Sequence, residues 1–228
     1  EEAYVTAVLL QVAQAVVSSN ELDDILDTIV HLMPILVGID CSIIFLWDET
    51  GGGYKPTQIY GGCWKSGLTS LKKLYAPGEF PILDTVRASD QTIIVPMEIN
   101  TSSIETWKDI QPSADYIESK RYLTEKADLL MAFPLSVKGK LFGVLFAIES
   151  NSSKNFRERR LEIITGIAQQ TALAIQNDLF QRETVERERL EREFQLAHEI
   201  QQSFLPSELP SLSDWDLDVR WRPAHQVG

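Results

Sequence analysis

The two thiols of the chain, Cys41 and Cys63, are its most reactive side chains. Two thiols can form a redox couple when one is a low-pKa nucleophile and the other can reach it to resolve a mixed disulfide. Two cysteines are too few for a disulfide framework, and their spacing does not fit a four-ligand zinc site. Because Cys41 opens an alternating hydrophobic segment, the simpler interpretation is a small buried residue. This cysteine usage indicates a reducing, cytoplasmic compartment.

Carboxylates and imidazoles could hold a metal. Asp216 and Asp218 lie two residues apart in an alternating apolar and polar segment, residues 215–221, so they would project from one face of a strand. Solvent-facing positions of that strand explain them without a metal. The histidines are far apart in sequence and form no metal-spaced pair and no dyad with a cysteine: His31, His198 and His225. We therefore predict no catalytic residue, no metal ligand and no cofactor in this chain.

Composition limits the class of partner. The 228 residues include 21 Lys and Arg and 33 Asp and Glu, a formal net charge of −12. Proteins that bind nucleic acid gain affinity by neutralising phosphates with basic side chains, so we expect no nucleic-acid partner. The longest apolar runs, such as residues 141–148, are far shorter than the roughly 18 residues of a membrane span, so we expect no membrane partner. With Glu1 first and no targeting segment, the sequence predicts a fragment of a longer protein.

The pattern of apolar residues predicts the elements that would position a site. Two amphipathic helices are expected at residues 3–17 and 22–37, with Gly38 as the C-cap of the second. Strands are predicted at 41–47, 54–60, 92–95, 130–137 and 141–149, with short helices at 79–88 and 114–125.

The second half contains a long helix, predicted at residues 155–203. Its first part, to Ile175, has an apolar face, whereas residues 177–203 contain neither Gly nor Pro and residues 182–193 are mostly charged. At about 1.5 Å per residue this helix would be about 70 Å long, too long to be buried in one domain of this size.

Four segments follow one another in an order that is typical of a known family. A first strand ends in an acidic residue, a Pro-Leu strand is followed by a Gly-Val-Leu strand, and an amphipathic helix closes the set: residues 39–48, Phe133-Pro134-Leu135-Ser136-Val137, Leu141-Phe142-Gly143-Val144-Leu145 and residues 156–177. This order resembles the GAF family of small-molecule sensor domains. The resemblance implies an α+β fold, a GAF-like antiparallel sheet with helices on one face plus a long C-terminal helical linker. It assigns residues 1–178 to a GAF sensor domain and leaves 179–205 as a helical, coiled-coil linker.

A second resemblance lies at the C-terminus. Residues 196–206, then Leu209-Pro210, then Trp221-Arg222-Pro223-Ala224-His225-Gln226-Val227-Gly228, resemble the entry to SpoIIE-type serine/threonine phosphatase domains of the PPM superfamily. The resemblance implies that residues 206–228 are the first strand of a truncated phosphatase domain. It also implies a manganese or magnesium site in the full-length protein, built from carboxylates past Gly228. The expected substrate of the parent protein is a phosphoprotein.

A ligand pocket is the expected use of a GAF sheet. On the first strand, Ile44 and Leu46 should face the helices, which directs Phe45 and Trp47 toward the pocket. Tyr60 and Trp64 would supply further aromatic walls. We therefore take Phe45, Trp47, Tyr60 and Trp64 as the candidate ligand-binding residues. The alternative is that these side chains form a second hydrophobic layer in a pocket that has shrunk.

Other GAF activities leave weaker signals. Some GAF domains reduce free methionine sulfoxide with cysteines, which would need Cys41 and Cys63 as a pair. Neither cysteine is followed by histidine, as a bilin attachment site would require. Asn155 and Glu158 partly resemble the sequence of cyclic-nucleotide-binding GAF domains, but helix capping already explains both residues.

The sequence as a whole predicts the cytoplasmic regulatory region of a bacterial SpoIIE-type phosphatase. The GAF domain would bind a small molecule or a partner, and a homodimer through the closing GAF helix and the linker would transmit the signal. The fragment itself is expected to be inactive. The alternative is a stand-alone GAF protein that binds a ligand or acts as a thiol-dependent methionine sulfoxide reductase.

Overall fold

The structure is a computed structural model that describes residues 21–61, 74–97, 110–112, 128–149, 157–204 and 218. The chain divides into two compact units, Glu1–Asp178 and Leu179–Gly228. The helices expected at residues 3–17 and 114–125 lie outside the described residues, and so does the strand expected at 215–221 except for Asp218.

The first described helix, α2, spans Leu22–Val37 and turns one face toward the sheet. Its buried residues recur at intervals of three and four, as an amphipathic helix requires: Leu22, Ile25, Leu26, Ile29, Val30, Met33 and Val37. The helix ends at Gly38, whose backbone N–H donates to the Pro34 carbonyl oxygen at 2.9 Å. The predicted C-cap is confirmed.

Five strands form one antiparallel sheet in the order β2-β1-β5-β4-β3. They are β1 (Cys41–Asp48), β2 (Gly53–Gly61), β3 (Ile93–Met97), β4 (Asp128–Val137) and β5 (Lys140–Glu149), with helix α3 (Pro81–Ser89) before β3. All these elements were predicted from the sequence, and their ends differ from the prediction by one or two residues.

The β4–β5 hairpin contains a tight turn and the Gly-Val-Leu motif. Lys138 and Gly139 both have positive φ angles, 52° and 79°, which matches the twist of a two-residue hairpin turn. Farther along β5, a Cβ atom on Gly143 would lie 2.2 Å from the Phe45 carbonyl oxygen. The glycine of the Gly-Val-Leu motif is therefore required by the close approach of β5 to β1.

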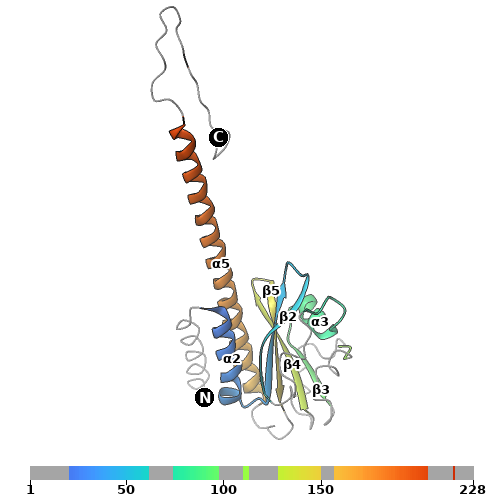
Figure 1. Cartoon of the computed structure of the whole chain (residues 1–228). Coiled ribbons are helices and arrows are strands. Elements are labelled where there is room, and N and C mark those ends of the chain that lie inside the picture. Colours follow the sequence, from blue (N-terminus) through green and yellow to red (C-terminus); the bar gives the residue numbers. More distant parts are fainter. Residues whose placement is uncertain are drawn as a thin grey trace, which may run out of the picture. The chain divides into compact units, whose positions relative to one another are not determined.

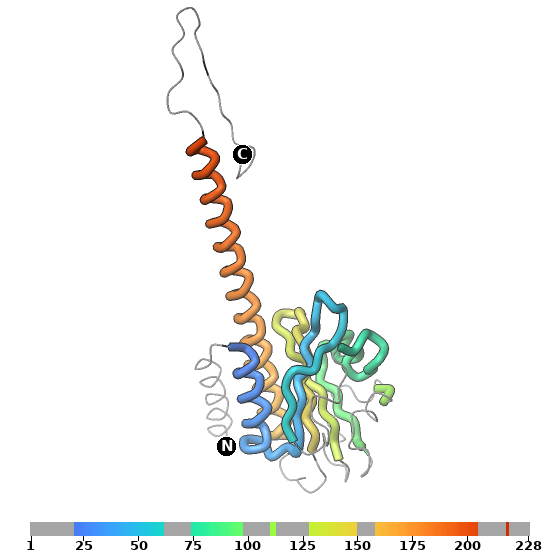
Figure 2. Tube along the Cα trace, in the orientation of Figure 1, coloured from blue at the N-terminus to red at the C-terminus, as the bar shows by residue number. Residues whose placement is uncertain are grey.

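The sheet separates two hydrophobic clusters. The helix-side cluster joins α2 and the first part of α5 to one face, and the outer cluster joins α3 to the opposite face. Figures 1 and 2 show α2 and α3 on opposite sides of the sheet. The α+β fold with an antiparallel sheet and its long helices on one face is confirmed, and α3 adds a short helix on the other face.

Helix α5 spans Arg157–Ser203 and is 47 residues long. Up to Asp178 its apolar face belongs to the helix-side cluster, through residues such as Ile164, Ile167 and Ile175. From Leu179 onward nearly all of its side chains are exposed. Near its start, Arg160 forms an ion pair with Glu149, which ends β5 and is 1% exposed. The start of α5 is thereby fixed to the end of β5.

No helix in the described part of the chain carries an apolar stretch long enough to cross a lipid bilayer.

Candidate functional site

Strand β1 places the first two candidate residues together. Its side chains alternate, so Ile44 and Leu46 lie in the helix-side cluster while Phe45 and Trp47 lie in the outer cluster. The predicted orientation of this strand is confirmed.

Phe45 is the centre of an aromatic group that we call the aromatic cluster: Phe45, Tyr75, Phe80 and Phe146. All four are essentially fully buried. The ring of Phe45 lies 5.9 Å from Tyr75, 5.7 Å from Phe80 and 5.4 Å from Phe146 between centroids, each in an edge-to-face arrangement. Such pairs add to the stabilisation from burial alone. Around Phe45, then, the outer face is packed with aromatic rings.

The sequence patterns do not indicate Tyr75, Phe80 or Phe146 as members of this cluster. Phe146 could have been found, because Val144, Phe146 and Ile148 alternate along β5 as Ile43, Phe45 and Trp47 do along β1. Tyr75 and Phe80 stand in an irregular segment before α3, and Tyr75 is placed by an isolated bridge to Tyr54. No local pattern in the sequence marks that bridge.

Trp47 and Arg87 form the rim of the aromatic cluster. Trp47 is half-buried and its ring lies 4.9 Å from that of Tyr54 between centroids. The guanidinium carbon of Arg87, on α3, lies 3.4 Å from the centroid of the Trp47 ring, a cation–π contact. This rim combines a flat aromatic surface with an exposed positive charge, a combination suited to a planar or anionic group.

Tyr54 lies beneath the rim. It is fully buried and its hydroxyl donates a hydrogen bond to the Leu83 carbonyl oxygen at 3.1 Å. Burial raises the pKa of Tyr54 to about 12; the negative charge of Asp84 contributes to the rise and Arg87 opposes it. Tyr54 is therefore a neutral hydrogen-bond donor at physiological pH.

The pKa of Tyr54 predicts an alkaline loss of stability. An unfolded tyrosine ionises near pH 10 and Tyr54 in the folded state near 12, so within this window only the folded state keeps the proton. The free energy of unfolding should therefore fall as the pH rises from about 10 to about 12. Tyr54→Phe should flatten this fall in urea unfolding, and Tyr60→Phe, on the other face, serves as control. An equal slope in wild type and Tyr54→Phe would contradict the assignment.

Tyr60 lies on the opposite face of the sheet from Phe45. Its ring is 4.9 Å from that of His31 on α2, in an edge-to-face contact. The cause is a β-bulge: Ile44 pairs with Gln58 and Phe45 with Pro56, so Thr57 is an extra residue in β2. An extra residue reverses the side-chain alternation beyond it. The structure thus separates Tyr60 from Phe45 and Trp47, and Trp64 lies outside the described residues.

Cys41 is fully buried in the outer cluster and is disulfide-bonded. The expectation of a buried residue is confirmed, whereas the expected reduced state is not what the structure contains. Cys63 lies outside the described residues.

The candidate metal ligands do not come together in the described residues. No group of three or more His, Cys, Asp or Glu side chains is placed to hold a metal ion there. His31 contacts the Asp27 carbonyl oxygen at 2.8 Å, and His198 contacts Gln202 at 3.0 Å. Asp48 accepts hydrogen bonds from the N–H groups of Gly51 and Thr50, which lower the pKa of its carboxyl and fix the β1–β2 turn.

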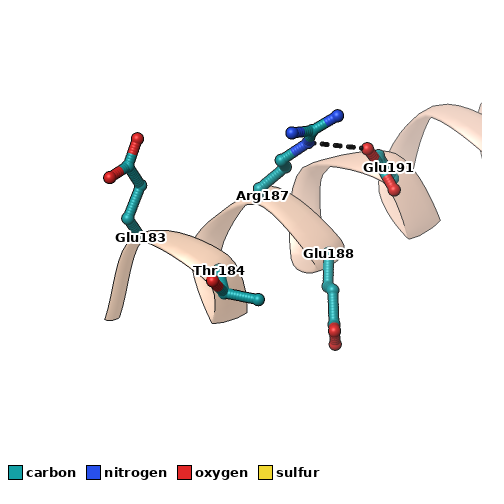
Figure 3. A pocket seen from close by; sticks show the side chains of 5 residues that line it. All are labelled: Glu183, Thr184, Arg187, Glu188 and Glu191. Atoms are coloured by element: carbon teal, nitrogen blue, oxygen red, sulfur yellow. Dashed lines mark hydrogen bonds and ion pairs between the residues drawn. The ribbon is translucent and has the colours of Figure 1, made fainter. Parts of the chain in front are cut away.

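A surface hollow lies on α5, far along the sequence from the aromatic cluster. It is lined by Glu183, Thr184, Arg187, Glu188 and Glu191, and Figure 3 shows Arg187 directed toward Glu191. All five side chains come from one stretch of one helix, so no second described element closes the hollow. Small-molecule pockets are normally concave and lined from several elements. We do not assign a ligand to this hollow.

The family model of the GAF domain matches residues 21–175. This range contains the whole sheet, α2, α3 and the buried part of α5. The chain therefore belongs to the GAF domain family. GAF domains are sensor and ligand-binding regulatory domains.

Solved structures, among them two GAF domains, share the fold. The GAF domain of an Acinetobacter phosphoenolpyruvate-protein phosphotransferase is 20% identical with a TM-score of 0.54, covering 75% of this chain and 92% of that one. The corresponding domain from Coxiella burnetii is 19% identical with a TM-score of 0.57, covering 79% and 98%. A free methionine-R-sulfoxide reductase from Neisseria meningitidis is 16% identical with a TM-score of 0.51, covering 75% and 88%. At these identities the likeness concerns the fold alone. No curated protein matches the sequence significantly.

Proposed function

We propose that the chain is the regulatory sensor region of a bacterial SpoIIE-type serine/threonine phosphatase. A small molecule or a protein partner acts on the outer face of the GAF sheet. The signal passes through α5, in a homodimer, to a catalytic domain that continues the chain. The proposed setting is the cytoplasm.

The single observation that carries this proposal is the continuity of α5. One helix, Arg157–Ser203, begins in the hydrophobic core of the GAF unit and continues as an exposed, charged helix. The exposed part of this helix packs against no other described segment of the chain, and most helical stability in proteins comes from packing. A helix that is rigidly held by a sensor core is suited to carry a displacement out of that core.

A contiguous set of contacts joins the aromatic cluster to α5. Phe146 of β5 packs against Phe45 and Phe80, and the same strand ends at Glu149. Glu149 is nearly fully buried and pairs with Arg160 of α5. Ligand binding that shifts Phe146 would therefore act on the start of α5 through one strand and one buried ion pair.

The phosphatase part of the proposal rests on the resemblance of residues 196–228 to the entry of SpoIIE-type domains. The catalytic carboxylates and their manganese or magnesium ions would belong to residues after Gly228. A phosphorylated protein would be the substrate. Residues 1–228 would supply regulation and no catalysis.

The experiment is to express the chain together with the residues that its gene encodes after Gly228. We expect manganese-dependent release of phosphate from a phosphoprotein by the longer chain and none by residues 1–228, which serve as the matched control. A gene that encodes no acidic metal motifs there, or a longer chain without metal-dependent phosphatase activity, contradicts the proposal.

A second candidate is a stand-alone GAF protein with thiol chemistry, and the disulfide at Cys41 is the observation that favours it. Against it, Cys41 is fully buried, whereas a reactive thiolate must be accessible to its substrate. Substituting Cys41 and Cys63 by serine should leave reduction of methionine sulfoxide unchanged from background. A thiol-dependent activity that these substitutions remove would favour this second candidate.

A further inference from the structure

The exposed part of α5 carries large apolar side chains that nothing in the described chain covers. Within Leu179–Phe204 they include Phe180, Leu190, Phe194 and Ile200, each between 41% and 58% exposed. Three ion pairs within the helix lie among them: Arg187–Glu191, Arg189–Glu193 and Glu188–Arg192. Ion pairs of this kind add only a few tenths of a kcal/mol each to an isolated helix, which leaves the apolar residues unexplained.

One set of positions, spaced alternately by three and four residues, contains half of the large exposed apolar side chains of this segment, including all three of its phenylalanines. We call it the linker seam: Phe180, Glu183, Arg187, Leu190, Phe194, Ala197, Gln201 and Phe204. Positions with this spacing lie on one face of a helix and are the contact positions of a two-stranded coiled coil. Phe204 directly follows the helix, and its N–H donates to the Gln201 carbonyl oxygen at 3.2 Å. The second half of the seam is apolar except for Gln201, and the first half contains two residues of opposite charge, Glu183 and Arg187.

A competing set of positions shares Glu183, Leu190, Ala197 and Phe204 with the linker seam. It replaces Arg187 by Glu186, Phe194 by Glu193 and Gln201 by Ile200. A dimer in this register would therefore bring three glutamates of each copy to the contact line with no arginine among them. Like charges facing one another are destabilising. The linker seam has one glutamate and one arginine at the contact line, so opposite charges offset its like-charge contacts and the charges favour the linker seam.

Charge complementarity also identifies the occupant as a second copy. In a parallel dimer along the linker seam, Arg187 of each copy faces Arg187 of the other copy and lies next to the heptad positions of that copy's Glu183 and Glu186. Each copy thus offers one cation where its partner offers two anions. A polar layer of this kind fixes the register of a coiled coil at some cost in stability.

We infer that a second copy of this chain docks in parallel along the linker seam, with Arg187 as the polar layer that sets the register. This inference rests on the proposed function, in which a dimeric linker transmits the signal. It adds the face of the helix and the residue that define the dimer.

The first test is the oligomeric state of single variants by sedimentation equilibrium. Phe194→Glu places a charge in the seam and should weaken dimerisation by at least about 100-fold. Val185→Glu is the matched control, because Val185 is 65% exposed and lies on the opposite side of the same helix turns. It should remain dimeric. Circular dichroism and thermal unfolding of the GAF unit check that both variants are folded.

The possible outcomes distinguish a failure of the linker seam from a failure of the proposed function. A dimer that survives Phe194→Glu but dissociates in Ile200→Glu contradicts the seam and leaves a dimeric linker in place. A wild-type chain that is monomeric at high concentration overturns the seam and the dimeric mechanism together. The phosphatase assay of the longer chain is independent of both results.

The second test concerns the polar layer. Arg187→Leu should tighten the dimer by about tenfold, because it replaces a charge in the seam by an apolar side chain. Arg189→Leu also removes one ion pair of the helix but lies off the seam, so it should have no such effect. A single cysteine introduced at Phe194 should cross-link two copies under oxidation, and one at Val185 should not. Equal behaviour of Arg187→Leu and Arg189→Leu, or cross-linking at Val185 alone, overturns the inference.

Discussion

Phe45→Ala is expected to lower the free energy of unfolding by about 4 kcal/mol, the largest effect that we predict for a single aromatic residue. Phe45 is fully buried and its ring contacts three other aromatic rings of the cluster. Its removal forfeits the burial of the ring and leaves a cavity that the neighbouring rings cannot fill without leaving their edge-to-face arrangement. Urea unfolding of the folded chain measures the change.

Tyr60→Ala is the control for Phe45→Ala. Both residues were predicted to line one pocket and stand on paired strands, but Tyr60 is 36% exposed and lies on the other face. Its loss should cost about 1 kcal/mol, as is usual for a partly exposed side chain. Equal losses in the two variants would be incompatible with a filled outer face around Phe45.

The cavity in Phe45→Ala also tests whether this face can hold a ligand. A dry cavity lined by apolar side chains binds small apolar molecules such as benzene. We expect benzene to raise the thermal midpoint of Phe45→Ala and to leave that of the wild-type protein unchanged. Stabilisation of the wild-type protein by the same compound would instead reveal an open pocket beside the aromatic cluster.

Arg160→Ala is expected to lower the free energy of unfolding by about 3 kcal/mol, because it breaks the ion pair that the buried carboxylate of Glu149 forms with Arg160. The exposed pair Glu188–Arg192 gives the matched control. Arg192→Ala should cost less than about 0.5 kcal/mol, since water screens that pair.

A double variant distinguishes the ion pair from packing. Glu149→Gln combined with Arg160→Met keeps much of the volume and removes both charges, so it should recover most of the stability that Arg160→Ala loses. If the double variant is as unstable as Arg160→Ala, the effect comes from lost packing around Arg160. The same variants would show whether the Glu149–Arg160 contact couples the sheet to α5 in the longer chain.

Sequence patterns were reliable where a structure depends on neighbouring residues. The alternation in residues 41–47 predicted β1 and its two faces, and the periodicity in residues 22–37 predicted α2. The absence of Gly and Pro from residues 177–203 predicted that α5 continues past the domain. In each case the side chains of one segment repeat with the period of the element they form.

The candidate site was predicted less completely. Phe45 and Trp47 lie on the expected face, but the expectation that Tyr60 joins them assumed a regular strand. The extra residue at Thr57 is visible only in the pairing of β2 with β1. A bulge depends on how two strands pair, so the sequence of one strand alone does not predict it.

Local patterns in the sequence are enough to identify the elements of this protein, the sensor family of residues 21–175 and the continuous charged helix α5. The side chains that fill the outer face of the sheet depend instead on tertiary contacts. Tyr75 and Phe80 come from an irregular segment, and Phe146 comes from β5. Phe146 meets Phe45 because β5 pairs with β1 in the sheet. Tyr75 is brought to the same face by its bridge to Tyr54. Local periodicity fixes the direction of a side chain within its own element, whereas its neighbours across the sheet depend on contacts between segments far apart in the chain.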